Sequence, residues 1–77
     1  MTVQVVLNDK PGVLVNLLTV FYKANANILT INQNIPVKGK AFVSVSARSE
    51  NMSIEIDELL KCLFEVQGVI KIDSIVG

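Results

Sequence analysis

The hydrophobic period of the chain changes across one short loop, and this change limits the folds that are available. Residues 2–8 alternate between apolar and polar side chains, a period of two that predicts a strand with one buried face. From Gly12 to Lys23 the apolar residues recur at three- and four-residue spacing, which predicts an amphipathic helix. The loop between them contains Pro11-Gly12, and we expect Pro11 to occupy the first helical position, where its missing N–H costs nothing.

The rest of the chain repeats both patterns. Asn25 and Asn27 are expected to end the first helix, because Asn tolerates the left-handed backbone of a helix end. A second strand is predicted over residues 27–35, with Leu29, Ile31 and Ile35 on one face. A hairpin loop is predicted over residues 36–40, followed by a third strand from Ala41 to Arg48 whose inward residues are Ala41, Val43, Val45 and Ala47. A second helix is predicted next, with Ile56, Leu59, Leu60 and Leu63 buried. A fourth strand is predicted over residues 69–75, after Gly68.

This order of elements, β-α-β-β-α-β, is the split βαβ plan of ferredoxin-like α+β domains. Right-handed crossovers place both helices on one face of a four-stranded antiparallel sheet with the strand order 4-1-3-2. Residues 1–77 are expected to form a single domain, because the length leaves no room for a second core. The face of the sheet without helices carries mostly polar side chains, so we expect it to be hydrated or partly covered by a partner.

Composition argues against several classes of function. Seven basic and seven acidic residues cancel without a basic cluster, which argues against binding nucleic acid. No apolar run approaches the ~20 residues of a membrane helix, and the start of the chain does not resemble a signal peptide. The single cysteine, Cys62, is consistent with a reducing cytoplasm, and we expect its thiol to be buried or half-buried. The chain has no His, no cluster of metal-binding residues and no phosphate-binding glycine loop, so no metal or cofactor is expected.

The loop before the first helix has the properties of an anion site. The N–H groups of Gly12, Val13 and Leu14 are expected to lack partners inside the helix, and the helix dipole adds partial positive charge there. Such a site suits a carboxylate. A plain strand-to-helix turn explains the same residues, and Asp9 would then serve only to cap the helix.

Four segments together resemble the ACT domain family. They are Asp9-Lys10-Pro11-Gly12-Val13-Leu14, Asn27-Ile28-Leu29-Thr30-Ile31-Asn32-Gln33, and Asp57-Glu58-Leu59-Leu60 with Gly68-Val69. The second segment is particularly similar to PheB-type ACT-domain proteins of bacteria. The resemblance implies the same βαββαβ fold and a regulatory module that pairs with a second copy and binds an amino acid at the pair interface. PheB-type proteins also carry an N-terminal segment that this chain lacks, so the chain is either an excised C-terminal domain or a short stand-alone member.

The resemblance also implies where a ligand binds. In the family the ligand lies against the loop after the first strand and contacts the second strand of a partner. The corresponding loop positions are Asn8, Asp9, Pro11, Gly12, Val13 and Leu14, and the strand positions are Asn27, Ile28, Thr30 and Asn32. Simpler roles are also open, because Asn27 suits the turn and Thr30 and Asn32 suit a solvated strand face.

Three functions follow from this comparison. The first is a homodimer or larger homo-oligomer that senses an amino acid, with phenylalanine or another apolar one as the candidates. The second is a ligand-free oligomerisation module of a larger protein. The third, a chorismate mutase-like enzyme, is weakest, because a dianionic substrate calls for convergent cations and the single Arg48 and scattered lysines do not supply them.

Overall fold

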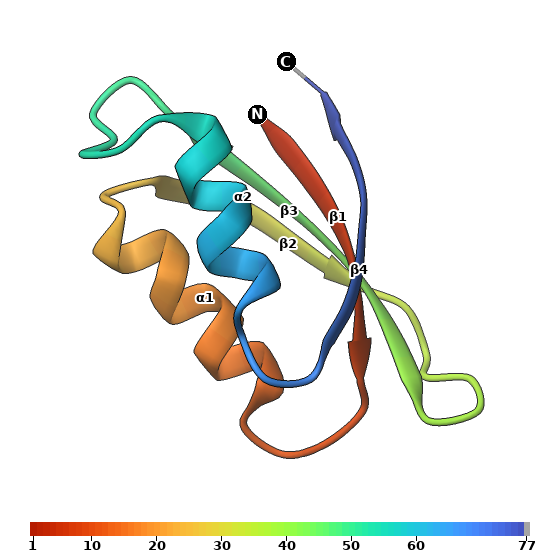
Figure 1. Cartoon of the computed structure of the whole chain (residues 1–77). Coiled ribbons are helices and arrows are strands. Elements are labelled where there is room, and N and C mark those ends of the chain that lie inside the picture. The colour runs from red at the N-terminus through yellow and green to blue at the C-terminus, as the bar shows by residue number, and fades with distance from the viewer. Residues whose placement is uncertain (77) are drawn as a thin grey trace.

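The computed structural model describes the backbone of residues 1–76 and the side chains of residues 1–72. The elements are β1 (Thr2–Asn8), α1 (Val13–Lys23), β2 (Asn27–Gln33), β3 (Lys40–Arg48), α2 (Ile56–Phe64) and β4 (Val69–Val76). The strands form one antiparallel sheet in the order β2-β3-β1-β4, which confirms the predicted ferredoxin-like topology. Figure 1 shows both helices on one face of this sheet, and the start of β1 and the end of β4 lie side by side at one end of it.

The hydrophobic core lies between the two central strands and the helices. The inward positions of β1 are Val3, Val5 and Leu7, and all three are almost completely buried. The predicted inward set of β3 is also confirmed, because each of its members is at most 2% exposed. The helices close the core with their own buried residues, which are Val13, Leu17 and Phe21 on α1 and Leu59 and Leu63 on α2. The strands with a period of two and the helices therefore bury their apolar faces in one shared core.

The second strand differs from its prediction. A bulge places Leu29 between Ile28, which pairs with Ala47, and Thr30, which pairs with Ser46. A bulge adds one unpaired residue and reverses the alternation beyond it, so Ile28 shares the helix side with Ile31, while Leu29 is 53% exposed. The predicted strand over residues 27–35 is also too long, because β2 ends at Gln33, and Ile35, predicted on the same face as Ile31, lies beyond it and is exposed.

The first helix ends as the asparagine pattern predicts. Asn25 has a φ of 61°, its N–H donates to the carbonyl of Tyr22, and the N–H of Ala26 donates to the carbonyl of Phe21. This pair of bonds is the Schellman motif, which satisfies carbonyls that the helix end leaves free. The Asn25 side chain also donates to the backbone carbonyl of Asn51 at 2.7 Å and so ties this end of α1 to the connection before α2.

The predicted hairpin loop is a tight two-residue turn. Lys38 and Gly39 both have positive φ, and Val37 and Lys40 exchange two backbone hydrogen bonds of 3.0 Å. Positive φ at both central residues is the type I′ geometry, which matches the twist of the flanking strands. The turn places Gly39 at the end of the sheet where β1 also ends.

The second helix buries its predicted stripe only in part. Leu59 and Leu63 are fully buried, while Ile56 and Leu60 are half-buried. Cys62 is exposed, so the prediction of a buried or half-buried thiol is wrong. The helix is short, and Cys62 lines a hollow together with Val20 and Lys23 of α1. Within the residues that the structure describes, neither helix has the length and apolar character required to cross a bilayer.

Candidate functional site

The loop between β1 and α1 is held in place by backbone hydrogen bonds from two neighbouring turns. The N–H of Asn8 donates to the carbonyl of Gly68 at 2.7 Å, and the N–H of Asp9 donates to the carbonyl of Gly39 at 2.8 Å. The N–H of Lys10 donates back to the carbonyl of Asn8 at 2.9 Å. The start of β4 and the β2–β3 hairpin therefore fix the position of this loop.

The start of α1 corrects three expectations. Gly12 is the N-cap with a φ of 86°, so the helix begins at Val13 and Pro11 precedes it. The N–H of Val13 is not free, because it donates to the carbonyl of Lys10 at 3.3 Å. Asp9 does not cap the helix, since no side chain does. In the part of the chain that the structure describes, the N–H groups of Gly12 and Leu14 have no hydrogen-bond partner.

A hollow of about 240 Å³ lies beside this helix start, and we call it the loop hollow. It brings together three of the predicted residues, which are Asn8, Pro11 and Val13. Its other lining residues are Lys10, Asn16, Gln67 and Gly68. The loop hollow thus combines three carboxamide side chains with one lysine, all near the amino end of a helix.

Asn16 and Gln67 were not among the predicted site residues. Asn16 follows Gly12 by four residues, and its N–H donates to the Gly12 carbonyl at 2.9 Å. Helical spacing therefore places Asn16 on the side of α1 that faces the loop. That spacing was a usable signal in the sequence. Gln67 carries no such signal, because it reaches the loop only through the contact between its neighbour Gly68 and α1.

The predicted residues on β2 lie apart from the loop hollow within one chain. Asn27 pairs with Arg48 at one end of β3, whereas Asn8 pairs with Lys40 at the other end. Asn27 and Ile28 therefore lie at the end of the sheet opposite to the loop. Thr30 and Asn32 are on the face without helices, where they pair with Ser46 and Ser44. One chain does not bring the two predicted groups together.

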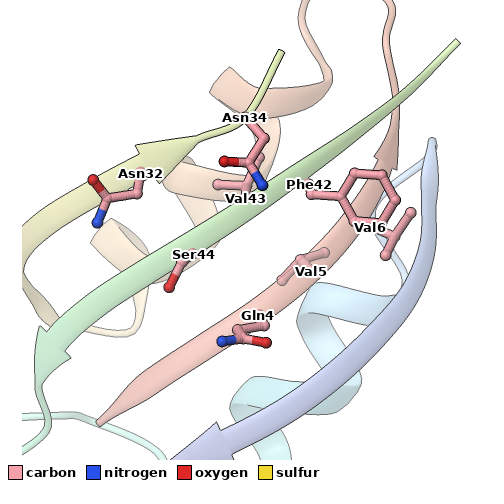
Figure 2. A pocket seen from close by; sticks show the side chains of 8 residues that line it. All are labelled: Gln4, Val5, Val6, Asn32, Asn34, Phe42, Val43 and Ser44. Atoms are coloured by element: carbon pink, nitrogen blue, oxygen red, sulfur yellow. The ribbon is translucent and has the colours of Figure 1, made fainter. Parts of the chain in front are cut away.

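A second hollow of about 220 Å³ lies on the face of the sheet without helices, which we call the open face. Figure 2 shows its lining side chains, with Phe42 and Val6 next to each other and the amides of Asn32, Asn34 and Gln4 to one side of this pair. The remaining lining residues are Val5, Val43 and Ser44. Of the predicted ligand residues, only Asn32 contributes to this hollow.

Gly12 offers a direct test of whether the loop contacts another molecule. Its positive φ costs an L-residue about 1–2 kcal/mol, so Gly12→Ala is expected to lower the free energy of unfolding by that amount, measured by urea denaturation. A Cβ at Gly12 has nothing within 4 Å in the chain itself. Any additional loss of self-association or ligand binding would therefore come from contact with another molecule.

Gly39→Ala is the matched control, because Gly39 also has a positive φ and open space around its Cβ position. Similar loss of stability in both variants, with loss of association or binding in Gly12→Ala alone, is the expected result. Unchanged association and binding in Gly12→Ala would contradict a contact at this loop.

The side chains that line the two hollows are mostly amides and apolar groups. Among the described residues there is no group of three or more His, Cys, Asp or Glu placed to hold a metal ion. The polar side chains at the loop hollow are three amides and Lys10, which can hydrogen-bond a small polar molecule, whereas Asp9, Gly12 and Leu14 do not line it. The groups that do line it are suited to hydrogen bonding.

The chain is similar in sequence to proteins of several bacteria, two of which are described below. A UPF0735 ACT domain-containing protein of Caldicellulosiruptor saccharolyticus is 46% identical over 72 residues, which are 94% of this chain and 48% of that protein. Its counterpart in Geobacillus kaustophilus is 45% identical over 69 residues, 90% of this chain and 47% of that protein. The chain spans about half the length of these curated relatives.

Two solved structures have a similar fold. The ACT domain from the GTP pyrophosphokinase of Chlorobium tepidum superimposes with a TM-score of 0.74 and 26% identity, over 94% of this chain and 91% of that one. The small subunit of acetolactate synthase from Thermotoga maritima gives a TM-score of 0.75 at 19% identity, over 94% of this chain and 44% of that one, and so shows the fold alone. The family model of the ACT domain matches residues 1–64. The chain therefore belongs to the ACT domain family, whose members are typically regulatory ligand-binding modules.

Proposed function

We propose that this ACT domain pairs with a second copy through β2 and binds an amino acid between the two copies. The observation that carries the proposal is the separation of the two groups of site residues. The loop hollow and the start of β2 lie at opposite ends of one sheet. A second copy supplies the missing half of the site to each chain.

The edge of β2 has free hydrogen-bonding groups for such pairing. The N–H of Asn34 donates to the carbonyl of Phe42, so Asn34 and every second residue before it face β3. By alternation, the N–H and C=O groups of Ile31 and Gln33 point away from the sheet. An edge strand of this kind pairs readily with another strand. The partly exposed side chains of Leu29 and Ile31 add apolar area along the same edge.

Twofold symmetry then determines which residues meet. A symmetric extension of the sheet pairs the two β2 strands antiparallel. The start of β2 in one copy consequently lies next to the end of β2 in the other. Asn27 and Ile28 of the second copy thereby come to the end of the sheet where the loop hollow lies.

The chemistry of the loop fits a zwitterionic amino acid. The free N–H groups of Gly12 and Leu14, at the positive end of α1, suit a carboxylate. Asn8 or Asp9 would receive the ammonium, and Asp9 supplies the opposite charge. Val13 and Leu14, with Ile28 of the second copy, would provide apolar walls, which favours an apolar side chain such as that of phenylalanine. Asp9 would repel a phosphorylated ligand, while Lys10 is the one cation among the described residues that line the loop hollow.

The proposal also covers the subtype of ACT domain and the cellular compartment of the chain. We propose a PheB-type regulatory domain in the cytoplasm, where the exposed Cys62 stays reduced. Binding of the amino acid would shift the state of an attached segment. The curated relatives, which are about twice as long, and the ACT domain taken from a GTP pyrophosphokinase both support a role as one part of a larger protein.

A thermal-shift screen of the amino acids tests this function, since a ligand at ~100 times its dissociation constant adds about 2.7 kcal/mol of stability. For the amino acid that stabilises the chain most, Asp9→Ala is expected to weaken binding by about 1–3 kcal/mol in calorimetry, because a charged hydrogen-bond partner is lost. Asp57→Ala is the control. It removes the same charge from the first turn of α2, which lies at the opposite end of the sheet.

Two results would reject amino-acid binding at this loop. The first is binding that Asp9→Ala leaves undiminished, and the second is a preference for a nucleotide over every amino acid. If no amino acid stabilises a chain that is nonetheless dimeric, the ligand-free oligomerisation module becomes the better assignment. The exposed apolar residues Leu29, Ile35 and Val37 along β2 and the following loop favour that second function.

A further inference from the structure

Two hollows show which side of α1 faces α2. The loop hollow, which also includes the α2–β4 turn, is lined on α1 by Val13 and Asn16. A hollow of about 260 Å³ between the helices is lined on α1 by Val20 and Lys23 and on α2 by Cys62. The four α1 residues recur at three- and four-residue spacing, so they lie on one side of the helix. The opposite side of α1 therefore faces away from α2.

The side of α1 away from α2 carries Leu14, Leu18 and Tyr22 at four-residue spacing. The two leucines are partly buried against the core, whereas Tyr22 is 81% exposed. Val15, two helical turns before Tyr22, is also exposed. Because α1 packs on β2 while α2 packs on β4, this side of α1 lies above the β2 edge. Its apolar side chains therefore adjoin the partly exposed Ile31 of that edge.

A β2-paired dimer brings two copies of this helix side together. Two helices side by side on four strands, with the strands ~4.8 Å apart, leave about 10 Å for each helix. Continuing the sheet through β2 into a second copy places the two α1 helices about 10 Å apart, a distance at which helices pack. Twofold symmetry makes them antiparallel, so the end of α1 in one copy lies beside the start of α1 in the other.

We propose that Tyr22 of the second copy packs on the start of α1 and forms part of the amino-acid site. The inference rests on the proposed β2 pairing and adds a residue to the site. The backbone groups of Ile31 point outward near the middle of β2, and α1 runs back along β2 with Leu18 as its middle residue. A symmetry axis at Ile31 thus passes close to Leu18. Tyr22 and Leu14 lie four residues on either side of Leu18, so each Tyr22 meets Leu14 of the other copy.

Tyr22 reaches the site together with the residues that the second copy already contributes. The N–H of Asn25 donates to the carbonyl of Tyr22 at 3.0 Å, so the tyrosine stands at the helix end that leads into Asn27 and Ile28. Its ring would lie beside Leu14, where it adds an aromatic wall for an apolar or aromatic ligand side chain. A tyrosine at an interface buries its ring and keeps its hydroxyl in contact with water. The exposed ring of the single chain gains this burial only from a second copy.

The fluorescence of Tyr22 tests the contact between the copies without a ligand. Tyr22 is the only tyrosine and the chain has no tryptophan, so the signal comes from this side chain alone. Ile31→Pro, which removes an outward N–H of the β2 edge, is the monomeric reference. Quenching by acrylamide is expected to be about twofold weaker in the dimeric wild type than in Ile31→Pro, because the second copy covers the ring.

Calorimetry with L-phenylalanine tests the contact with the ligand. Tyr22→Ala is expected to weaken binding by about tenfold at a concentration where light scattering shows both proteins to be dimers. Tyr22→Phe, which restores the ring, is expected to recover most of the lost affinity. Phe64→Ala is the matched control, because Phe64 is also an exposed aromatic residue but lines a hollow with β4 at the other edge of the sheet. It is expected to bind as the wild type does.

The outcomes separate this inference from the pairing on which it rests. A monomeric wild type overturns both. A dimer in which acrylamide reaches Tyr22 as readily as in Ile31→Pro overturns the helix contact and leaves the β2 pairing intact. Unchanged L-phenylalanine binding in dimeric Tyr22→Ala, an equal loss in Phe64→Ala, or a wild-type dimer that binds no L-phenylalanine overturns the contact with the ligand.

Discussion

Ile31→Pro is expected to convert the proposed dimer into a monomer and to abolish amino-acid binding. The N–H of Ile31 points away from β3, so proline removes a donor that only a second copy would use. Proline is tolerated at such an edge position, and therefore the sheet of the single chain is expected to remain folded. Light scattering coupled to size-exclusion chromatography measures the mass, and circular dichroism verifies the fold.

Two further variants separate the backbone effect from the side-chain effect. Ile31→Thr removes apolar area but keeps the N–H group, and we expect it to weaken the dimer without abolishing it. Asn32→Pro removes an N–H that faces β3, so it is expected to destabilise the single chain itself. A dimer that persists unchanged in folded Ile31→Pro would exclude β2 as the interface.

The sequence predicted the fold because its periodic signals agree with one another. Alternation in β1 and β3 and the helical spacing from Leu14 to Phe21 each specify one buried face, and the topology that buries all of these faces together is the observed one. Asn25 and the Lys38-Gly39 turn were equally readable, because positive φ restricts the residues found there.

The misassigned positions depend on interactions that span the chain. The bulge at Leu29 breaks the expected alternation of β2 at Ile28 and Leu29, while Thr30, Ile31 and Asn32 lie on the predicted faces. An edge strand has too few buried neighbours to reveal such a bulge in its sequence. Gly12 is in the left-handed region, so Pro11 lies outside the helix where a simpler helix start would include it. Gln67 reaches the loop hollow only because the α2–β4 turn packs on α1. The residues next to Gln67 in the sequence do not predict that packing.

The contact between Gly68 and Val13 connects the α2–β4 turn with the candidate site. Gly68 has a φ of 100°, and its carbonyl accepts the hydrogen bond from Asn8 that holds the loop. A Cβ at this position would lie 2.7 Å from Cγ2 and 3.0 Å from Cγ1 of Val13. Val13 is the first residue of α1 and is only 8% exposed, so it has little room to move away.

Gly68→Ala is therefore expected to lower the free energy of unfolding by about 2–4 kcal/mol, measured by urea denaturation at a fixed protein concentration. Part of this loss is the backbone cost of a positive φ, and part is the overlap with Val13. Gly39→Ala, where a Cβ meets open space, is expected to show the backbone part alone.

If the overlap contributes, adding Val13→Ala to Gly68→Ala will cost less than the sum of the two single changes, since the shortened side chain no longer meets the new Cβ. Strict additivity, or a loss in Gly68→Ala no greater than in Gly39→Ala, would contradict a close contact between this turn and the start of α1.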